Sequence, residues 1–334
     1  MVAGVTQRIA ERGHDLAIVD EFGTRTWAEH NERVNRLIHG LRGLGLAVGD
    51  TMCDVGNNRH EGLEAFAAGS STGLVLVPVN WHFSAEEIAY VLENSEAKVI
   101  VADAEFADAA TAAADEAGVA LRIAYGGPIE GFTDIEEVIA SGSPDEPADQ
   151  VSGKSMLYTS GTSGRPKGVQ STLQQVGGDP EENLGKLELL LSLYRLTDLD
   201  GKVVLCNAPL YHGGPLAICA VPFFLGATIV LRRKWDGEET LRLIDEYGVN
   251  IYYAVPTHFT RLLKLPEQTR AGFSGASLDY VMHTAAPCPP GVKQQMIDWW
   301  GPVLMELYGA SEAGGVGTVV DSHEWLQKPG TVGR

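Results

Sequence analysis

Apolar and polar positions follow two alternating periods along most of the chain. Residues 84–96 (SAEEIAYVLENSE) carry apolar side chains at helical spacing behind Ser84, and Glu87 follows three residues later, which is the capping-box pattern of a helix start. The apolar run 97–103 (AKVIVAD) predicts a buried strand, and the Ala-rich segment 104–119 predicts the next helix.

The same alternation continues in the second half of the chain. Continuous apolar strands between helices are typical of parallel sheets that are covered on both faces. The pattern therefore predicts an α/β protein with mainly parallel sheets flanked by helices. Helices are predicted over 237–250, 257–265 and 289–301, and strands over 251–256, 278–285 and 302–309.

Three segments depart from this alternation. Residues 141–153, rich in Pro, Ser, Gly and acidic residues, predict a surface connector, so we expect a first α/β subdomain over 1–150 and a second over 151–334. Residues 170–186 also have the composition of a loop. The most apolar run, 216–231, is too short for a membrane span and contains Pro and Gly, so it predicts buried helix and strand.

The formal charge of −19 argues against nucleic acid and anionic membranes as partners, because phosphate binding needs a basic patch. Residues 101–150 hold twelve acidic residues and one basic residue, Arg122, which predicts a solvated face. The N-terminus lacks the apolar core of a signal peptide, and we expect no transmembrane segment and a cytoplasmic location. The cysteines are too far apart to indicate a disulfide framework or a zinc site: Cys53, Cys206, Cys219 and Cys288.

Residues 157–169 (LYTSGTSGRPKGV) join an apolar strand to a loop rich in glycine and hydroxyl groups. Glycines let a backbone approach a phosphate closely, while hydroxyls, amides and a lysine supply donors and positive charge. The order of residues differs from a Walker A loop, in which GxxxxGK is followed by Ser or Thr. The stretch predicts a phosphate-binding loop; its composition alone also leaves a flexible linker open.

This stretch resembles the phosphate loop of the adenylate-forming superfamily, which includes acyl-CoA synthetases, aryl-CoA ligases, luciferases and peptide-synthetase adenylation domains. The resemblance covers essentially the whole chain and implies the large N-terminal domain of that family, with two sheets in a layered αβαβα arrangement. Further segments match family motifs in the family's order: APLYHGGP (208–215), VPTHFTRLL (255–263), TAAPCPPG (284–291), YGASE (308–312) and GTVGR (330–334).

The resemblance implies an ATP-dependent acid–thiol ligase that uses Mg²⁺. Such enzymes join a carboxylate to the α-phosphate of ATP, release pyrophosphate, and pass the acyl group to coenzyme A. A carboxylate is a weak nucleophile, so positioning and charge neutralisation must supply most of the acceleration. Two other functions stay open: a fatty acyl-AMP ligase that loads a carrier protein, and a non-catalytic module that binds a nucleotide or an acyl ligand.

Tyr211 and His212 bear on the substrate. Amino-acid-activating relatives carry Phe-Asp at these two positions, and that aspartate pairs with the amino group of the substrate. The resemblance therefore implies an apolar carboxylic acid. Fatty acids are the first expectation, while aryl, terpenoid and sterol side-chain acids stay open.

The resemblance also assigns roles to single residues. Catalytic roles fall on Thr159, His212 and Glu312, with Thr159 and Glu312 binding Mg²⁺. ATP phosphates are expected to contact Thr159, Ser160, Gly161, Thr162, Ser163, Gly164, Lys167 and Ser311. Adenine is expected to contact Ala285, Ala286, Pro287, Tyr308 and Gly309. The acyl pocket is expected to include Tyr211, His212, Gly213, Pro256, Thr284 and Ala310.

Two of these positions, Thr284 and Ala285, stand where relatives are commonly richer in glycine. Val255, Pro256, Thr257 and His258 resemble another wall of the substrate site, and ordinary packing at a strand end stays open for each of them.

The sequence ends at Arg334, inside a segment that resembles the GxxGRP motif of the family. The TGD motif of relatives, and their mobile C-terminal lid with its catalytic lysine, have no match in these residues. We therefore expect a piece of such a ligase without the lid domain. This piece is expected to bind ATP weakly, to adenylate slowly or not at all, and to make no thioester, because the lid supplies charge and excludes water. Homodimers occur among relatives, and by analogy only a homodimer stays open here.

Overall fold

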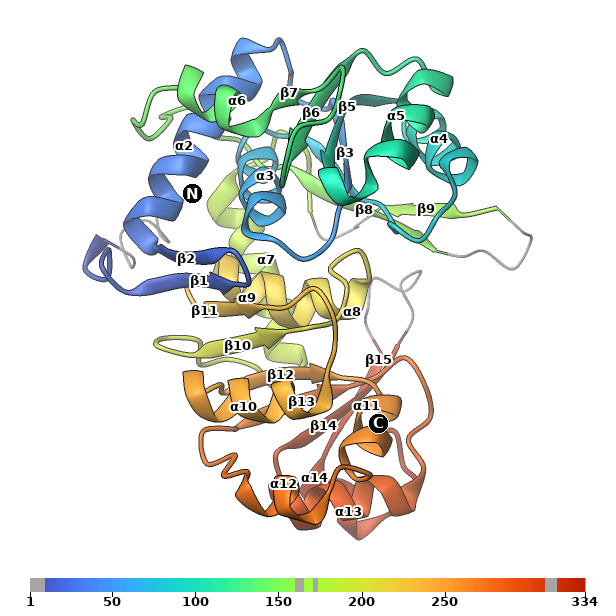
Figure 1. Cartoon of the computed structure of the whole chain (residues 1–334). Helices are drawn as coiled ribbons and strands as arrows, with labels where there is room; N and C mark the ends of the chain where they lie inside the picture. The colour runs from blue at the N-terminus through green and yellow to red at the C-terminus, as the bar shows by residue number, and fades with distance from the viewer. Residues whose placement is uncertain (1–9, 160–164, 171–173, 310–316, 334) are drawn as a thin grey trace. The chain divides into compact units, whose positions relative to one another are not determined.

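A computed structural model describes residues 10–159, 165–170, 174–309 and 317–333 of the chain (Figure 1). Internal contacts divide the chain into two compact units. Unit 1 comprises Met1–Ile18 and Phe22–Glu188, and unit 2 comprises Val19–Glu21 and Leu189–Arg334. The units are described separately below.

Unit 1 is built on a sheet whose described strands follow the order β7-β6-β5-β3-β4-β8-β9. Neighbouring strands pair in parallel, except that β8 and β9 form an antiparallel hairpin. The strands are β3 (Thr51–Val55), β4 (Val75–Pro78), β5 (Ala97–Asp103), β6 (Leu121–Tyr125), β7 (Thr133–Asp134), β8 (Lys154–Thr159) and β9 (Lys167–Gln170).

Helices cover both faces of this sheet (Figure 1). One apolar cluster joins Cys53 and Val55 of β3 to α4 and α5. The other face carries Met52 and Leu76, which lie close to Gly69 of α3; α3 packs on α2, and α2 packs on α6. The helices are α2 (Trp27–Gly43), α3 (His60–Ser71), α4 (Ala85–Asn94), the short 3-10 helix η1 (Ala104–Phe106), α5 (Ala107–Glu116) and α6 (Ile135–Ser141), followed by α7 (Pro180–Leu193), which runs from unit 1 into unit 2.

Unit 2 is built on a second sheet, in which the described strands β10 to β15 follow the order β15-β14-β13-β12-β10-β11. All these neighbours pair in parallel except β14 and β15. Beyond β11 the order continues with β1 (Leu16–Asp20), whose last residues belong to unit 2; β2 (Gly23–Thr26) belongs to unit 1. The strands are β10 (Val203–Cys206), β11 (Thr228–Leu231), β12 (Ile251–Ala254), β13 (Tyr280–His283), β14 (Leu304–Gly309) and β15 (Gly317–Asp321).

The second sheet also has helices on both faces. The face with Leu205 and Tyr252 shares an apolar cluster with α10, α11, α13 and α14. The opposite face carries Tyr253, against which Gly214 of α8 packs, and α8 leads into the π-helix η2 and α9. The helices are α8 (Gly213–Pro215), η2 (Leu216–Ala220), α9 (Val221–Phe224), α10 (Gly237–Tyr247), α11 (Pro256–Leu262), α12 (Glu267–Gly272), α13 (Pro290–Trp300) and α14 (Ser322–Gln327).

The predicted fold class is confirmed: two mainly parallel sheets are flanked by helices. The predicted strand over 97–103 is β5, and Ser84 caps α4 with the predicted capping box to Glu87. Residues 216–231 form buried helix and strand, as predicted. Among the described residues, every helix is too short or too polar to cross a membrane.

Two expectations differ from the structure. Residues 170–186 are not wholly loop, because α7 begins at Pro180, where the Asp179 carboxylate accepts the Glu181 N–H at 2.8 Å. The compact units also divide after Glu188, not after residue 150. The reason is that β8, which follows the 141–153 connector, pairs with β4 and so belongs to the sheet of unit 1.

Candidate active site

The predicted site residues of unit 2 that the structure describes follow or end strands at one edge of its sheet. Strands β10, β12, β13 and β14 run parallel, so their carboxyl ends meet at that edge, where α/β proteins commonly bind ligands. The segments that follow these strands contain the predicted residues Tyr211, His212, Gly213, Pro256, Thr284, Ala285, Ala286 and Pro287, and β14 itself ends with Tyr308 and Gly309.

The segment after β10 turns into α8 at His212. The His212 side chain is exposed, and its ring centroid lies 4.4 Å from that of the half-buried Tyr211, whose pKa is raised by burial. A Cβ atom on Gly214 would lie 2.6 Å from the Tyr253 hydroxyl oxygen, so only glycine fits there without a shift. Glycine thus lets the turn after His212 lie close against β12.

The segment after β12 begins α11. Pro256 is buried at the first position of this helix. The His258 ring stacks on Trp235, with ring centroids 4.5 Å apart and planes 10° apart, and burial lowers the pKa of His258 to about 4. His258 is therefore neutral near pH 7. Its ring is held in an aromatic stack, which favours the packing interpretation for this residue.

The ends of β13 and β14 carry the residues expected to contact adenine. Ala285 adopts φ = +72°, in the left-handed region that favours glycine, and its side chain is exposed. Thr284 is half-buried, whereas Ala286 and Pro287 are exposed. Tyr308 is 67% exposed, which leaves an aromatic face open for stacking.

In unit 1, Thr159 and Lys167 are directly paired at the open end of the β8–β9 hairpin. Thr159 is half-buried and Lys167 is exposed. The hairpin is fixed to α4, because the Tyr158 hydroxyl donates to Asn94 Oδ1 at 2.8 Å. The structure thus places the strand before the predicted phosphate loop and the strand after it.

Eight of the predicted residues lie outside the described part of the chain. They are Ser160, Gly161, Thr162, Ser163 and Gly164 of the phosphate loop, and Ala310, Ser311 and Glu312 of the YGASE segment. The metal site formed by Thr159 and Glu312 therefore stays a prediction.

Sequence reasoning missed a buried polar cluster in unit 2, formed by His283, Lys293 and Glu306. Lys293 Nζ lies 2.7 Å from Glu306 Oε2, and His283 Nε2 lies 3.7 Å from the same oxygen. A signal for Lys293 was present: it lies on the apolar stripe of α13 together with Met296 and Trp300, at spacings of three and seven residues.

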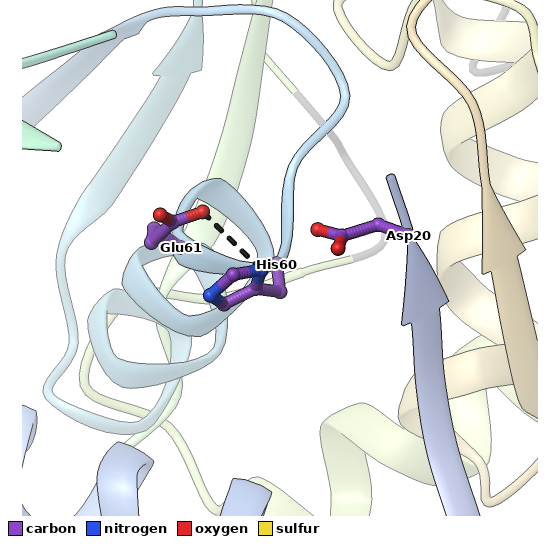
Figure 2. A group of neighbouring side chains, drawn as sticks. All are labelled: Asp20, His60 and Glu61. Atoms are coloured by element: carbon purple, nitrogen blue, oxygen red, sulfur yellow. Dashed lines mark ion pairs between the residues drawn. The ribbon is translucent and has the colours of Figure 1, made fainter. Parts of the chain in front are cut away.

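A second polar cluster that sequence reasoning missed lies in unit 1. Figure 2 shows His60 and Glu61 at the start of α3, where His60 Nδ1 lies 3.4 Å from Glu61 Oε2. Arg59 pairs with the same Glu61 carboxylate at 2.8 Å. Nearby in this unit, the Tyr125 hydroxyl donates to Asp54 Oδ1 at 3.1 Å, and burial raises the pKa of Asp54 to about 7.

Comparison with known proteins indicates the same family that the sequence motifs resemble. Residues 5–334 match the family model described as AMP-binding enzyme. The chain is 29% identical to a feruloyl-CoA synthase of an Amycolatopsis species over 325 residues, which cover 96% of this chain and 61% of that relative. It is 28% identical over 318 residues to the long-chain-fatty-acid–CoA ligase FadD13 of Mycobacterium tuberculosis, covering 92% of this chain and 59% of that protein.

The fold is similar to the inhibitor-bound N-terminal domain of FACL13 from Mycobacterium tuberculosis. The TM-score is 0.79 at 26% identity, and the match covers 99% of this chain and 80% of that structure. The chain spans less than two thirds of the length of the two curated relatives above.

Proposed function

The chain belongs to the AMP-binding enzyme family, and from that premise we propose that it forms the ATP- and acid-binding core of an AMP-forming acid–thiol ligase. The proposed reaction joins a carboxylate to the α-phosphate of ATP, releases pyrophosphate, and passes the acyl group to coenzyme A. The observation that carries the proposal is the shared carboxyl edge of β10, β12, β13 and β14, which bears the segments that the sequence singled out.

Each segment has a physical task in this proposal. The phosphate loop donates hydrogen bonds to the triphosphate, and His212 donates one to the negative charge that develops at the reacting carboxylate. The exposed ring of Tyr308 stacks on adenine. Thr159 and Glu312 hold Mg²⁺, because hydroxyl and carboxylate oxygens are the hard ligands that this ion prefers; when bound, the ion neutralises phosphate charge.

The proposed substrate is an apolar carboxylic acid. Tyr211 and His212 offer no carboxylate that could pair with a substrate amine at this position. Of the two curated relatives above, one is named for a feruloyl group and the other for long-chain fatty acids. We therefore place fatty acids first and aryl acids second in the test.

ATP–pyrophosphate exchange by the full-length protein that contains this chain, with a panel of fatty, aryl and sterol side-chain acids, tests this function. We expect exchange that depends on both Mg²⁺ and an acid. Product analysis with coenzyme A and with a phosphopantetheinylated carrier protein then identifies the thiol acceptor. A protein that neither binds ATP nor supports exchange with any acid would overturn the proposal.

Glu312→Gln tests the metal assignment. The neutral amide removes one charged oxygen ligand, so we expect Mg²⁺-dependent ATP binding and exchange to be lost while the melting temperature stays within the range of the parent protein. Glu238→Gln, at an exposed site in the first turn of α10, is the matched control and is expected to exchange normally. Normal exchange in Glu312→Gln would remove this residue from the site.

A further inference from the structure

Three buried polar side chains meet behind the loop of residues 284–289, and we call them the buried triad. Lys293 comes from α13, Glu306 from β14 and His283 from β13. Their residues are 0%, 7% and 0% exposed, respectively. The contacts of 2.7 Å and 3.7 Å described above both converge on Glu306 Oε2.

The surroundings of the triad are mainly apolar. Lys293 Nζ lies 5.2 Å from the centre of the Trp325 ring, and the His283 ring lies edge-on to Phe259 at 5.3 Å. Within the described residues, neither ring nitrogen of His283 has a hydrogen-bond partner. Burial and the neighbouring Lys293 lower the pKa of His283 to about 3, so this imidazole is neutral.

A buried ion pair in such a setting needs a reason other than stability. Removing two charges from water costs about as much as their attraction returns, and apolar residues of similar volume often serve as well or better. Burial lowers the pKa of Lys293, and its pairing with Glu306 opposes that shift. The arrangement of the chain around the pair suggests what the pair does.

The triad has residues at both ends of loop 284–289. The loop starts directly after His283, which is the Cα partner of Glu306 across β13 and β14. It ends directly before Pro290, the first residue of α13, and Lys293 follows within the first turn of that helix. The single carboxylate of Glu306 therefore contacts a side chain on each side of the loop.

The same loop contains an unfavourable backbone conformation. Ala285 has φ = +72°, and only two other non-glycine residues among those described have positive φ. Such a conformation persists only where the surrounding structure imposes it, and it often occurs at ligand sites. Ala285 is also one of the residues expected to contact adenine.

We propose that the buried triad is a positioning device that holds loop 284–289 in the left-handed conformation at Ala285 and so sets the affinity for the nucleotide. Lys293 and Glu306 are then positioning residues for adenine. The inference rests on the proposed function, because the role of the loop in adenine binding belongs to it.

The double variant Lys293→Met/Glu306→Leu separates positioning from folding. It removes both charges and leaves apolar side chains, so we expect a melting temperature at or above that of the parent chain. We expect ATP affinity, measured by calorimetry with MgATP, to fall by about fivefold or more, because the loop is no longer held in its strained form.

The matched control removes an ion pair from the other end of the same sheet. Lys202 and Asp279, which form a salt bridge, directly precede β10 and β13. Lys202→Met/Asp279→Asn is expected to bind MgATP within about twofold of the parent chain, a difference of less than half a kcal/mol. Parent-like affinity in a folded Lys293→Met/Glu306→Leu variant would overturn the inference.

Ala285→Gly tests whether ATP affinity can be rescued in the double variant. A merely structural role of the triad would not allow such a rescue. Glycine adopts positive φ without steric cost, so adding Ala285→Gly to the double variant should return ATP affinity toward the parent value. No recovery would contradict the proposed link between the triad and the loop.

Ala285→Gly in the parent chain keeps the inference testable even if the double variant does not fold. Relief of strain at this exposed position should raise the melting temperature, and a lower melting temperature would overturn the inference. Failure of the proposed function is seen separately, because it requires that the parent chain itself binds no ATP.

Discussion

Replacing Asp54 with asparagine should make the protein more stable, and by an amount that grows with pH. Asp54 lies in β3, where its Oδ1 accepts the Tyr125 hydroxyl at 3.1 Å. Burial is the main reason that its pKa rises from 3.8 to about 7, and the neighbouring charge of Asp103 raises it further. Asparagine has nearly the same shape, still accepts from Tyr125, and carries no charge at any pH.

The sign of the effect follows from the raised pKa. Well below its ordinary pKa of 3.8, the carboxyl is protonated in both the folded and the unfolded chain, and it costs no stability. As the pH rises, the unfolded chain loses the proton first, so stability falls until the folded carboxyl also ionises near pH 7. A pKa difference of about three corresponds to about 4 kcal/mol at most, of which about 2 to 3 kcal/mol develops between pH 5 and pH 8.

Urea unfolding of Asp54→Asn and of the parent protein at pH 5, 6, 7 and 8 measures this term. We expect the difference in unfolding free energy to grow by about 2 to 3 kcal/mol over that range. Asp108→Asn, at an exposed position of α5, is the control and should show no such growth. A difference for Asp54→Asn that stays constant, or that shrinks as the pH rises, would refute the reasoning.

Two further substitutions test packing that the structure makes explicit. Arg33→Met should lower the unfolding free energy by about 3 to 5 kcal/mol, because Arg33 lies 2.8 Å from Glu64, whose side chain is 0% exposed and would be left charged and unpaired. Urea unfolding measures this loss, and adding Glu64→Gln should recover much of it. A loss below about 1 kcal/mol would contradict the argument. Gly214→Ala should lower the unfolding free energy by about 1 to 3 kcal/mol, because the new Cβ would lie 2.6 Å from the Tyr253 hydroxyl. Thermal unfolding should show partial recovery of stability when Tyr253→Phe is added. Strictly additive effects of the two changes would contradict the predicted clash.

Local signals were enough to predict most elements of the fold. The capping box of Ser84 and Glu87, and the apolar run that became β5, depend on neighbours within a few residues, and such neighbours can be read from the sequence. The pairing of β8 with β4 could not be read in this way, because it joins residues far apart in the chain. The division into units after Glu188 depends on that pairing.

The residues of the candidate site also differ in whether local sequence signals could predict them. The segments at the carboxyl edge of unit 2 were found because each motif is contiguous in sequence. The buried triad was missed because its parts come from three elements, and because Glu306 acquires its partner only when β14 pairs with β13 beside α13. Lys293 on an apolar helix stripe was the one visible sign. The roles assigned to Ser311 and Glu312 stay predictions.

The assignment of Val19–Glu21 to unit 2 has a consequence for biosynthesis. Val19 belongs to the same buried apolar cluster as Leu205 and Val230, so it is synthesised well before the partners with which it forms a core. At ~5–20 residues per second, this segment waits roughly 10 to 40 s for those partners. Unit 2 therefore takes part of its interior from a distant segment of the chain, and a gene cut after Glu188 would separate the rest of the unit from Val19.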